Sequence, residues 1–353
     1  MEETILSKKN STVLRGMAIV SIALHNYFVK LGFSKPNEMS FLIENTNHFF
    51  EVALNGRFFV EIFSFLGWIG VPVFIFLTGY GVATRIPPLT KHKSIDYIKR
   101  NYLKLLALML LAVLLYAGMD VAKGNIWPGL LKRFSYLTML TNFAYPYLRC
   151  DPGVYWYFGL TFQFYLIWAL FGRHMRGNNL LLWSAVFMIG LYGICSLGKL
   201  EVLSIYRHCF TGWFFVFALG VWCAQSNMIQ RIKTNWWMEL IILVASSFLM
   251  IQMNRWLLAW VFIPVMALLF FLMLGLLLQR VKPLFNIFLW IGGLSAFIFV
   301  CHPIARTFVN KIFAPHVGIL LINVFIYFLF TILFAVLYRW IYQRITAAII
   351  KKV

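Results

Sequence analysis

The stretch Leu14–Phe28, LRGMAIVSIALHNYF, is apolar enough to lie in lipid and yet carries Arg15, His25 and Asn26. A charged side chain at the centre of a membrane-spanning helix costs about 2.5 to 3.5 kcal/mol, so it is retained where it faces a cavity, a partner or a substrate. A histidine titrates near neutral pH and can take a proton from a hydroxyl and return it to a leaving group. The pattern favours such chemistry at His25; the structural alternative is an Arg15 that reaches the headgroups and a neutral His25 bonded to a neighbouring helix.

Three further polar residues lie in or beside apolar stretches. Gln163 sits in the middle of one, where lipid offers its amide no partner, so it should face other helices. His302 precedes Pro303, which should break its helix there, so we expect His302 at the outer end, on the same side as His25. Asp151 precedes Pro152 in a pattern typical of a helix start.

The elements that must position these residues are membrane-spanning helices. Of the 353 residues, 62% are hydrophobic and 12% are charged, against roughly 25% charged in soluble domains. A helix needs about 20 apolar residues to cross a membrane. The segments that qualify lie near residues 12–31, 64–83, 103–119, 154–171, 179–197, 208–225, 236–252, 256–278, 286–303 and 316–338. We therefore expect an all-α integral membrane protein, a bundle of about ten transmembrane helices in a single domain, residues 1–353.

The formal net charge of +20 comes from 31 Lys and Arg against 11 Asp and Glu. In a soluble protein this would indicate nucleic acid binding. Here the basic residues cluster between apolar runs, as in cytoplasmic loops of membrane proteins, so we expect both termini in the cytoplasm and no nucleic acid partner. The N-terminal sequence lacks the pattern of a removable signal peptide. The five cysteines have no metal-ligand spacing, which predicts core packing and no metal site.

The second apolar stretch, GVPVFIFLTGYGVATR at residues 70–85, is rich in small residues and suited to close helix packing or to lining a cavity. It leads into a basic link from Arg85 to Lys104. A phosphorylated ligand or anionic lipid headgroups would bind there.

These pieces, in this order, resemble acyltransferase family 3, integral membrane enzymes that O-acylate envelope sugars. The matching stretches are LRGMAIVSIALHNYF, GVPVFIFLTGYGVATR, YIKRNYLKLL, YWYFGLTFQFYLIW and CHPI. The resemblance implies ten helices in the bacterial inner membrane. It also implies acyl-CoA, most simply acetyl-CoA, as the donor inside, and a glycan or glycolipid hydroxyl as the acceptor outside. We expect no permanently bound cofactor, and membrane lipids as the surrounding partners.

The resemblance also assigns roles to residues of this chain. His25 is the general base or a transient acyl carrier, and His302 positions the acceptor. Donors to the developing oxyanion are Asn26, Gln163 and Tyr80. The donor would be held by Arg15, Tyr80, Arg85, Lys99 and Arg100. The acceptor would be held by Glu61, Asp151, Tyr155 and Trp156.

Two departures from the family pattern matter. Nine residues, rather than the usual ten, separate Arg15 from His25, so the two side chains are about 80° apart on a helix. A local bulge or a different use of Arg15 is then required. Many members also carry an acid at positions that are Thr161 and Phe162 here, so a carboxylate that orients His25 must come from elsewhere, for instance Glu61 or Asp151.

Two other functions remain open from the sequence. A transporter or flippase of a lipid-linked or small polar substrate would use the same histidines as proton-relay or ligand groups. The missing acid also fits a non-catalytic membrane partner derived from the family.

Overall fold

The fold is all-helical, as expected: in the computed structural model every element among the described residues is a helix. The structure describes residues 5–86, 91–124, 127, 129–148, 153–177, 179–198, 200–226, 234–312 and 320–350. The chain divides into two compact units that alternate along the sequence, unit 1 from Met1–Pro88 and Phe171–Ser295, and unit 2 from Leu89–Leu170 and Ala296–Val353.

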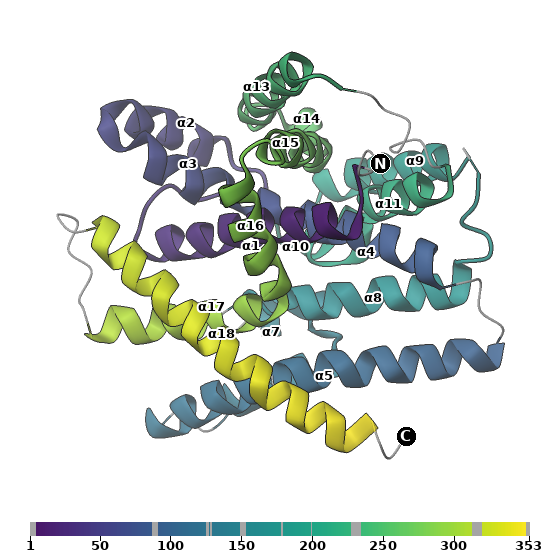
Figure 1. Ribbon diagram of the computed structural model, residues 1–353, viewed down its shortest axis with the longest axis vertical. Helices are drawn as coiled ribbons and strands as arrows, with labels where there is room; N and C mark the ends of the chain where they lie inside the picture. Colours follow the sequence, from purple (N-terminus) through teal and green to yellow (C-terminus); the bar gives the residue numbers. More distant parts are fainter. Residues whose placement is uncertain are drawn as a thin grey trace. The chain divides into compact units, whose positions relative to one another are not determined.

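Unit 1 contains the segment with Arg15 and His25, which forms α1 (Lys8–Lys30). Its other helices are α2 (Ile43–Val52), α3 (Phe58–Leu66), α4 (Gly70–Arg85), α9 (Asn179–Ser196), α10 (Leu200–His208), α11 (Phe214–Ser226), α13 (Trp236–Met253), α14 (Leu257–Trp260), α15 (Ile263–Leu278) and α16 (Lys282–Gly293). A 3-10 turn, η2 (Gly67–Ile69), joins α3 to α4, and a second, η5 (Phe210–Gly212), precedes α11. Figure 1 shows α1 in purple, crossed by α16.

Unit 2 contains the long helices α5 (Lys91–Ala122) and α18 (Leu320–Ile350), which contact each other (Figure 1). It also contains α6 (Gly129–Ser135), α7 (Tyr145–Leu148), α8 (Trp156–Phe171) and α17 (Ser295–Ile312). Its core is aromatic, because the rings of Tyr116, Tyr136 and Phe158 pack around the fully buried Tyr155.

Six described helical segments are long and apolar enough to cross a membrane. They are Lys8–Lys30, Asn55–Arg85, His92–Ala122, Asn179–Ser196, Trp236–Met253 and Leu320–Ile345, and each overlaps a predicted span. Three other predicted spans overlap the shorter apolar helices α8, α11 and α15. The predicted span 286–303 is not one helix, because α16 ends at Gly293 and α17 begins at Ser295. The protein is therefore of integral membrane type, whereas the number of ten spans and the cytoplasmic termini stay predictions.

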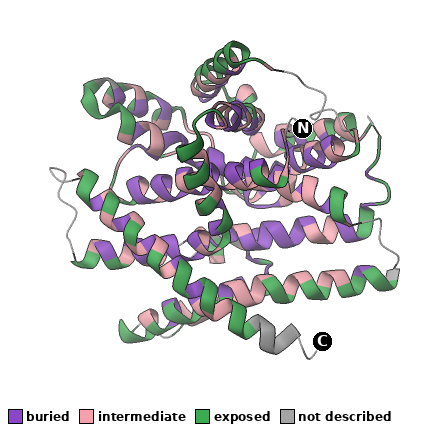
Figure 2. Cartoon of the chain, in the orientation of Figure 1, coloured by how far each residue is buried: buried purple, intermediate pink, exposed green. Residues whose placement is uncertain are grey.

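Burial separates the helices into two kinds. In α1, 72% of the most apolar window is buried inside the protein, against 17% in α9 and in α13 and 22% in α18. Figure 2 shows the same contrast between the mostly buried α1 and the exposed faces of α18. An apolar helix with most of its surface exposed is suited to contact with lipid, and a buried one can carry polar side chains that bind other helices.

The prediction for His302 was wrong in one respect. Rather than ending its helix, His302 is fully buried within α17, which continues through Pro303 to Ile312. Proline is tolerated inside membrane helices because other groups satisfy the backbone that it disturbs. Here Nδ1 of His302 lies 3.2 Å from the carbonyl oxygen of Ile298, and Thr307 donates to the carbonyl of Pro303.

Close backbone contact joins α1 to α16. A Cβ atom on Gly292 would overlap the carbonyl oxygen of Thr12, and one on Gly16 would overlap that of Phe288. Since neither carbonyl can move without bending its helix, the two helices depend on glycine at both positions.

We expect Gly292→Ala to lower the free energy of unfolding by about 1 to 3 kcal/mol, the usual cost of overpacking. Thermal unfolding of the detergent-solubilised protein measures this change. The matched control is Gly293→Ala at the next position, because a Cβ there meets nothing within 4 Å. Equal melting temperatures for the two variants would contradict the close contact.

Candidate functional site

His25 lies on the buried side of α1, against the junction of α3 and η2. Its Nδ1 is 2.8 Å from the carbonyl oxygen of Ser64. Because a carbonyl only accepts hydrogen bonds, Nδ1 carries the proton in this contact, and Nε2 of the neutral ring is the basic nitrogen. The arrangement fixes both the tautomer and the orientation of the imidazole.

The backbone beside His25 is held close by a glycine and a serine. A Cβ on Gly67 would lie 2.7 Å from the Cβ of His25, so only glycine allows this approach. Ser21, one turn earlier on α1, donates a hydrogen bond of 2.8 Å to the carbonyl of Gly67. The contact between α1 and η2 therefore holds the part of α1 that carries His25 in place.

The carboxylate beside His25 belongs to Glu38, a residue to which no sequence pattern pointed. Its Oε2 lies 3.7 Å from Nε2 of His25, and its side chain is 20% exposed. Glu38 follows α1 in the loop before α2. A carboxylate in this position stabilises the imidazolium that forms when Nε2 accepts a proton.

Glu61 and Asp151 were the two acids expected to orient His25. The structure gives Glu61 a different contact: it is buried, and its Oε2 accepts a hydrogen bond of 2.8 Å from the backbone N–H of Ser34. Ser64 in turn donates to the carbonyl of Ser34, so both residues fix the loop that leads to Glu38. Asp151 lies outside the described residues.

Arg15 and Asn26 lie on α1 with His25 but make separate contacts. Asn26 is half-buried, and its amide donates to the carbonyl of Ile22 one turn earlier. Arg15 is half-buried, donates to Thr12 at 3.0 Å and interacts electrostatically with Arg85, the last residue of α4. Because α1 is α-helical from end to end, no bulge brings Arg15 onto the face of His25.

A fully buried arginine lies close to this group. The guanidinium carbon of Arg207, on α10, lies 4.1 Å from the ring centre of Trp260, 4.7 Å from Trp213 and 5.7 Å from Trp68. Among the described residues its Nε and Nη2 have no hydrogen-bond partner. Burial lowers the pKa of Arg207 to about 10, against the opposing effects of nearby tyrosines and of Glu38. The guanidinium therefore remains charged at neutral pH.

Tyr80 lies on α4, five residues before Arg85. Its ring stacks on that of Phe76, with 6.4 Å between the ring centres. Tyr80 is half-buried and Arg85 is exposed. The structure therefore places Arg15, His25, Asn26, Glu61, Tyr80 and Arg85 in one unit, with Glu38 and Arg207 added to them.

The remaining predicted residues belong to unit 2. Gln163 is buried on α8, as expected for an amide that lipid cannot satisfy. Tyr155 and Trp156 are also buried; the hydroxyl of Tyr155 donates to the carbonyl of Val300, and the carbonyl of Trp156 accepts from Asn142. His302 is buried on α17, whereas Lys99 and Arg100 are exposed on α5.

The arrangement around His25 can do acid–base chemistry. It offers an oriented imidazole, a carboxylate next to the basic nitrogen and a buried cation near that carboxylate. In the part of the chain that the structure describes, no three His, Cys, Asp or Glu side chains group closely enough to hold a metal ion.

Comparison with known families gives one result. The model of acyltransferase family 3, described as an acyltransferase domain, matches residues 9–340 of the chain. Comparison with curated proteins and with solved structures gives no match. The family match covers residues of both units and includes every predicted site residue.

Proposed function

The chain belongs to acyltransferase family 3, and from that premise we propose that it is a bacterial inner-membrane enzyme that moves an acyl group, most simply acetyl, from acyl-CoA to a hydroxyl of an exported or envelope glycan. The observation that carries the proposal is the oriented imidazole of His25 beside Glu38 in a buried part of α1. Membership of an acyltransferase family does not favour the alternative of a transporter or flippase.

The reaction follows from the tautomer of His25. Nε2 takes the proton of the acceptor hydroxyl while the hydroxyl oxygen attacks the thioester carbonyl carbon, forming the new C–O bond. Glu38 stabilises the imidazolium that results. The tetrahedral intermediate then expels the CoA sulfur, the C–S bond breaks, and the imidazolium returns the proton to that sulfur. Nε2 of His25 thus acts as the base in the first step and, once protonated, as the acid in the second.

The donor phosphates are proposed to bind Arg15 and Arg85. Two arginines that interact electrostatically repel each other, so their arrangement is stabilised by an anion between or beside them. Arginine forms strong, charge-assisted hydrogen bonds with phosphate. Because Arg15 lies ten residues before His25, about 15 Å along the helix axis, an extended thiol arm would link the two sites.

The residues predicted to bind the oxyanion and the acceptor keep these roles. Asn26, Gln163 and Tyr80 are proposed donors to the oxyanion, and His302, Glu61, Asp151, Tyr155 and Trp156 are proposed contacts of the acceptor. Asn26 supports this assignment by its place, because it directly follows His25 on α1.

We expect His25→Gln to lower acyl transfer about 10²- to 10⁴-fold, the usual contribution of a general base. Release of free CoA from labelled acetyl-CoA, with and without a glycan acceptor, measures the activity. His174→Gln, at an exposed histidine, is the control and should retain wild-type activity. Near-normal activity of a folded His25→Gln protein would reject the assignment.

We expect Arg15→Ala to raise the KM for acetyl-CoA about 10- to 100-fold while kcat changes little, because the loss is that of one hydrogen bond to a charged group. Initial rates over a range of acetyl-CoA concentrations separate the two constants. Lys8→Ala removes a charge from the exposed first turn of the same helix and should leave the KM unchanged. An unaltered KM for Arg15→Ala would place the donor elsewhere.

A further inference from the structure

A groove of about 810 Å³ runs along α5 and α18 in unit 2. Its walls are leucine stripes of α5 and the residues Tyr338, Ile341, Tyr342 and Ile345 of α18. The hydroxyl of Tyr338 donates to the carbonyl of Leu108 and so ties the two walls together. The groove has the size of a ligand pocket and is mostly apolar.

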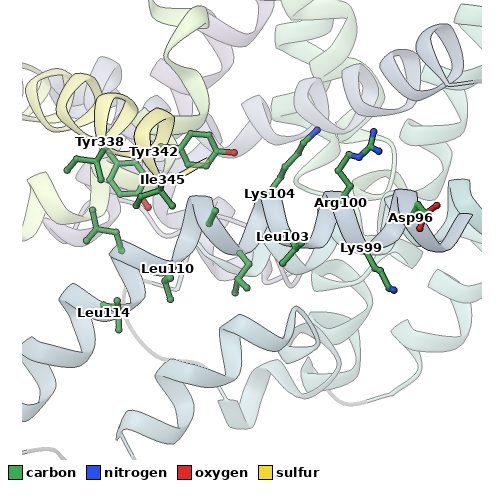
Figure 3. A pocket seen from close by; sticks show the side chains of 14 residues that line it. Asp96, Lys99, Arg100, Leu103, Lys104, Leu110, Leu114, Tyr338, Tyr342 and Ile345 are labelled. Carbon is green, nitrogen blue, oxygen red and sulfur yellow. The ribbon is translucent and has the colours of Figure 1, made fainter. Parts of the chain in front are cut away.

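Charge is confined to one end of this groove. Asp96, Lys99, Arg100 and Lys104 lie in the first half of α5, and Leu110 and Leu114 follow (Figure 3). Figure 3 shows Arg100 and Lys104 extending toward the same side of the helix. Among the described residues none of the three cations forms an ion pair, so the end of the groove keeps a net positive charge.

The apolar part has the length of one leaflet. From Lys104 to Leu114 is ten residues, about 15 Å of helix, which is half of the roughly 30 Å hydrocarbon core. Leu103, Leu110 and Leu114 are exposed in the structure, so a hydrocarbon chain along them removes no existing contact. An acyl chain with its headgroup at Lys104 would fill this space.

We propose that the groove binds one anionic phospholipid, its phosphate at Arg100 and Lys104 and its acyl chains along the leucines of α5 and the tyrosines of α18. Basic pockets between membrane helices recognise such headgroups, and each Lys or Arg near the surface adds to the attraction. This assignment gives Arg100 a lipid ligand in place of the donor phosphates predicted from the sequence.

The test titrates the full-length protein in dodecylmaltoside with dioleoyl phosphatidylglycerol or dioleoyl phosphatidylcholine and counts bound lipid by native mass spectrometry. We expect preferential binding of phosphatidylglycerol. The double variant Arg100→Gln/Lys104→Gln should bind it about 30-fold more weakly, since two charges are lost. Lys93→Gln, an exposed residue at the same end of α5 but outside the groove, is the control.

The variant Leu110→Trp distinguishes binding in the groove from binding to a charged surface alone. It leaves every charge in place and fills the apolar part, so it should also weaken phosphatidylglycerol binding. Equal binding of both lipids, or no effect of Leu110→Trp, would overturn the proposal. Displacement of the lipid by coenzyme A would overturn it too, because the basic end would then belong to the donor.

A second inference concerns Arg207 in unit 1 and rests on the proposed function. Contacts join this residue to His25 along two routes. On one, Trp68 packs near the guanidinium and directly follows Gly67, which lies against His25. On the other, the indole N–H of Trp260 donates a hydrogen bond of 2.6 Å to the carbonyl of Asn37, the residue before Glu38.

These routes connect a buried cation to the residues on either side of the His25–Glu38 pair, Gly67 and Asn37. The three tryptophans hold the guanidinium through cation–π contacts, and the indole N–H of Trp213 donates to the backbone carbonyl of Arg207. A guanidinium buried among apolar rings is poorly screened, so its field acts on carboxylates in its neighbourhood. Glu38 is one of the groups that act electrostatically on Arg207, and it is also part of the site.

We infer that Arg207 is a positioning residue, which holds Glu38 beside His25 through Trp260 and Asn37 without touching the substrate. Its effect on the reaction must then pass through Glu38. Two substitutions that act through one path do not add, and a double-mutant cycle measures this.

We expect Glu38→Gln and Arg207→Gln each to lower kcat about 10- to 100-fold, by analogy with residues that orient metal-bound histidines, with the KM for acetyl-CoA unchanged. The double variant should be no slower than Glu38→Gln alone. Arg207→Lys keeps the positive charge, should recover part of the rate, and serves in the same cycle if Arg207→Gln does not fold.

Multiplied losses in the double variant, or a change confined to KM, would overturn this role for Arg207. Acyl transfer by the wild-type protein tests the proposed function separately from the role of Arg207. If the wild-type protein transfers no acyl group, the proposed function fails; if it is active and the losses multiply, only the role of Arg207 fails.

Discussion

The hydrogen bond between Nδ1 of His25 and the carbonyl of Ser64 is the constraint on which the candidate site depends. It leaves Nε2 as the basic nitrogen and directs it toward Glu38. The bond joins α1 to Ser64 near the end of α3, and the close approach of α1 to the adjoining turn η2 requires glycine at position 67. A packing contact between backbones thus determines the protonation chemistry of one side chain.

The polar groups of unit 1 divide into two sets with different electrostatics. Around His25, a carboxylate and a buried guanidinium of opposite sign accompany the imidazole, so the set is nearly neutral when the ring is uncharged. At the other end of α1, Arg15 and Arg85 have the same sign and repel. A site that performs proton transfer benefits from balanced charge, whereas a site that binds a phosphorylated ligand benefits from an excess of positive charge.

The sequence predicts the features that depend on local composition. Apolar runs locate the helices, and the cost of a polar group in lipid predicts that His25 and Gln163 are buried. Glu38 and Arg207 escape such reasoning, because one lies in a loop and the other on a nine-residue helix, and each meets His25 or its neighbours only through the fold. His302 is the opposite case, in which local sequence gives a wrong prediction. Proline usually ends a helix, but α17 continues through Pro303, and His302 contacts the carbonyl of Ile298 within it.

The shortened spacing between Arg15 and His25 is accommodated by their neighbours rather than by the helix that carries them. Since α1 is regular, the two side chains point about 80° apart. Both directions meet the same segment of chain, residues 58–85: His25 contacts its first part at Ser64 and Gly67, and Arg15 interacts with its last residue, Arg85. A bulge is therefore unnecessary. The spacing between Arg15 and His25 determines which part of that segment each side chain contacts. It also sets the distance along α1 between the proposed donor phosphates and the reacting thioester.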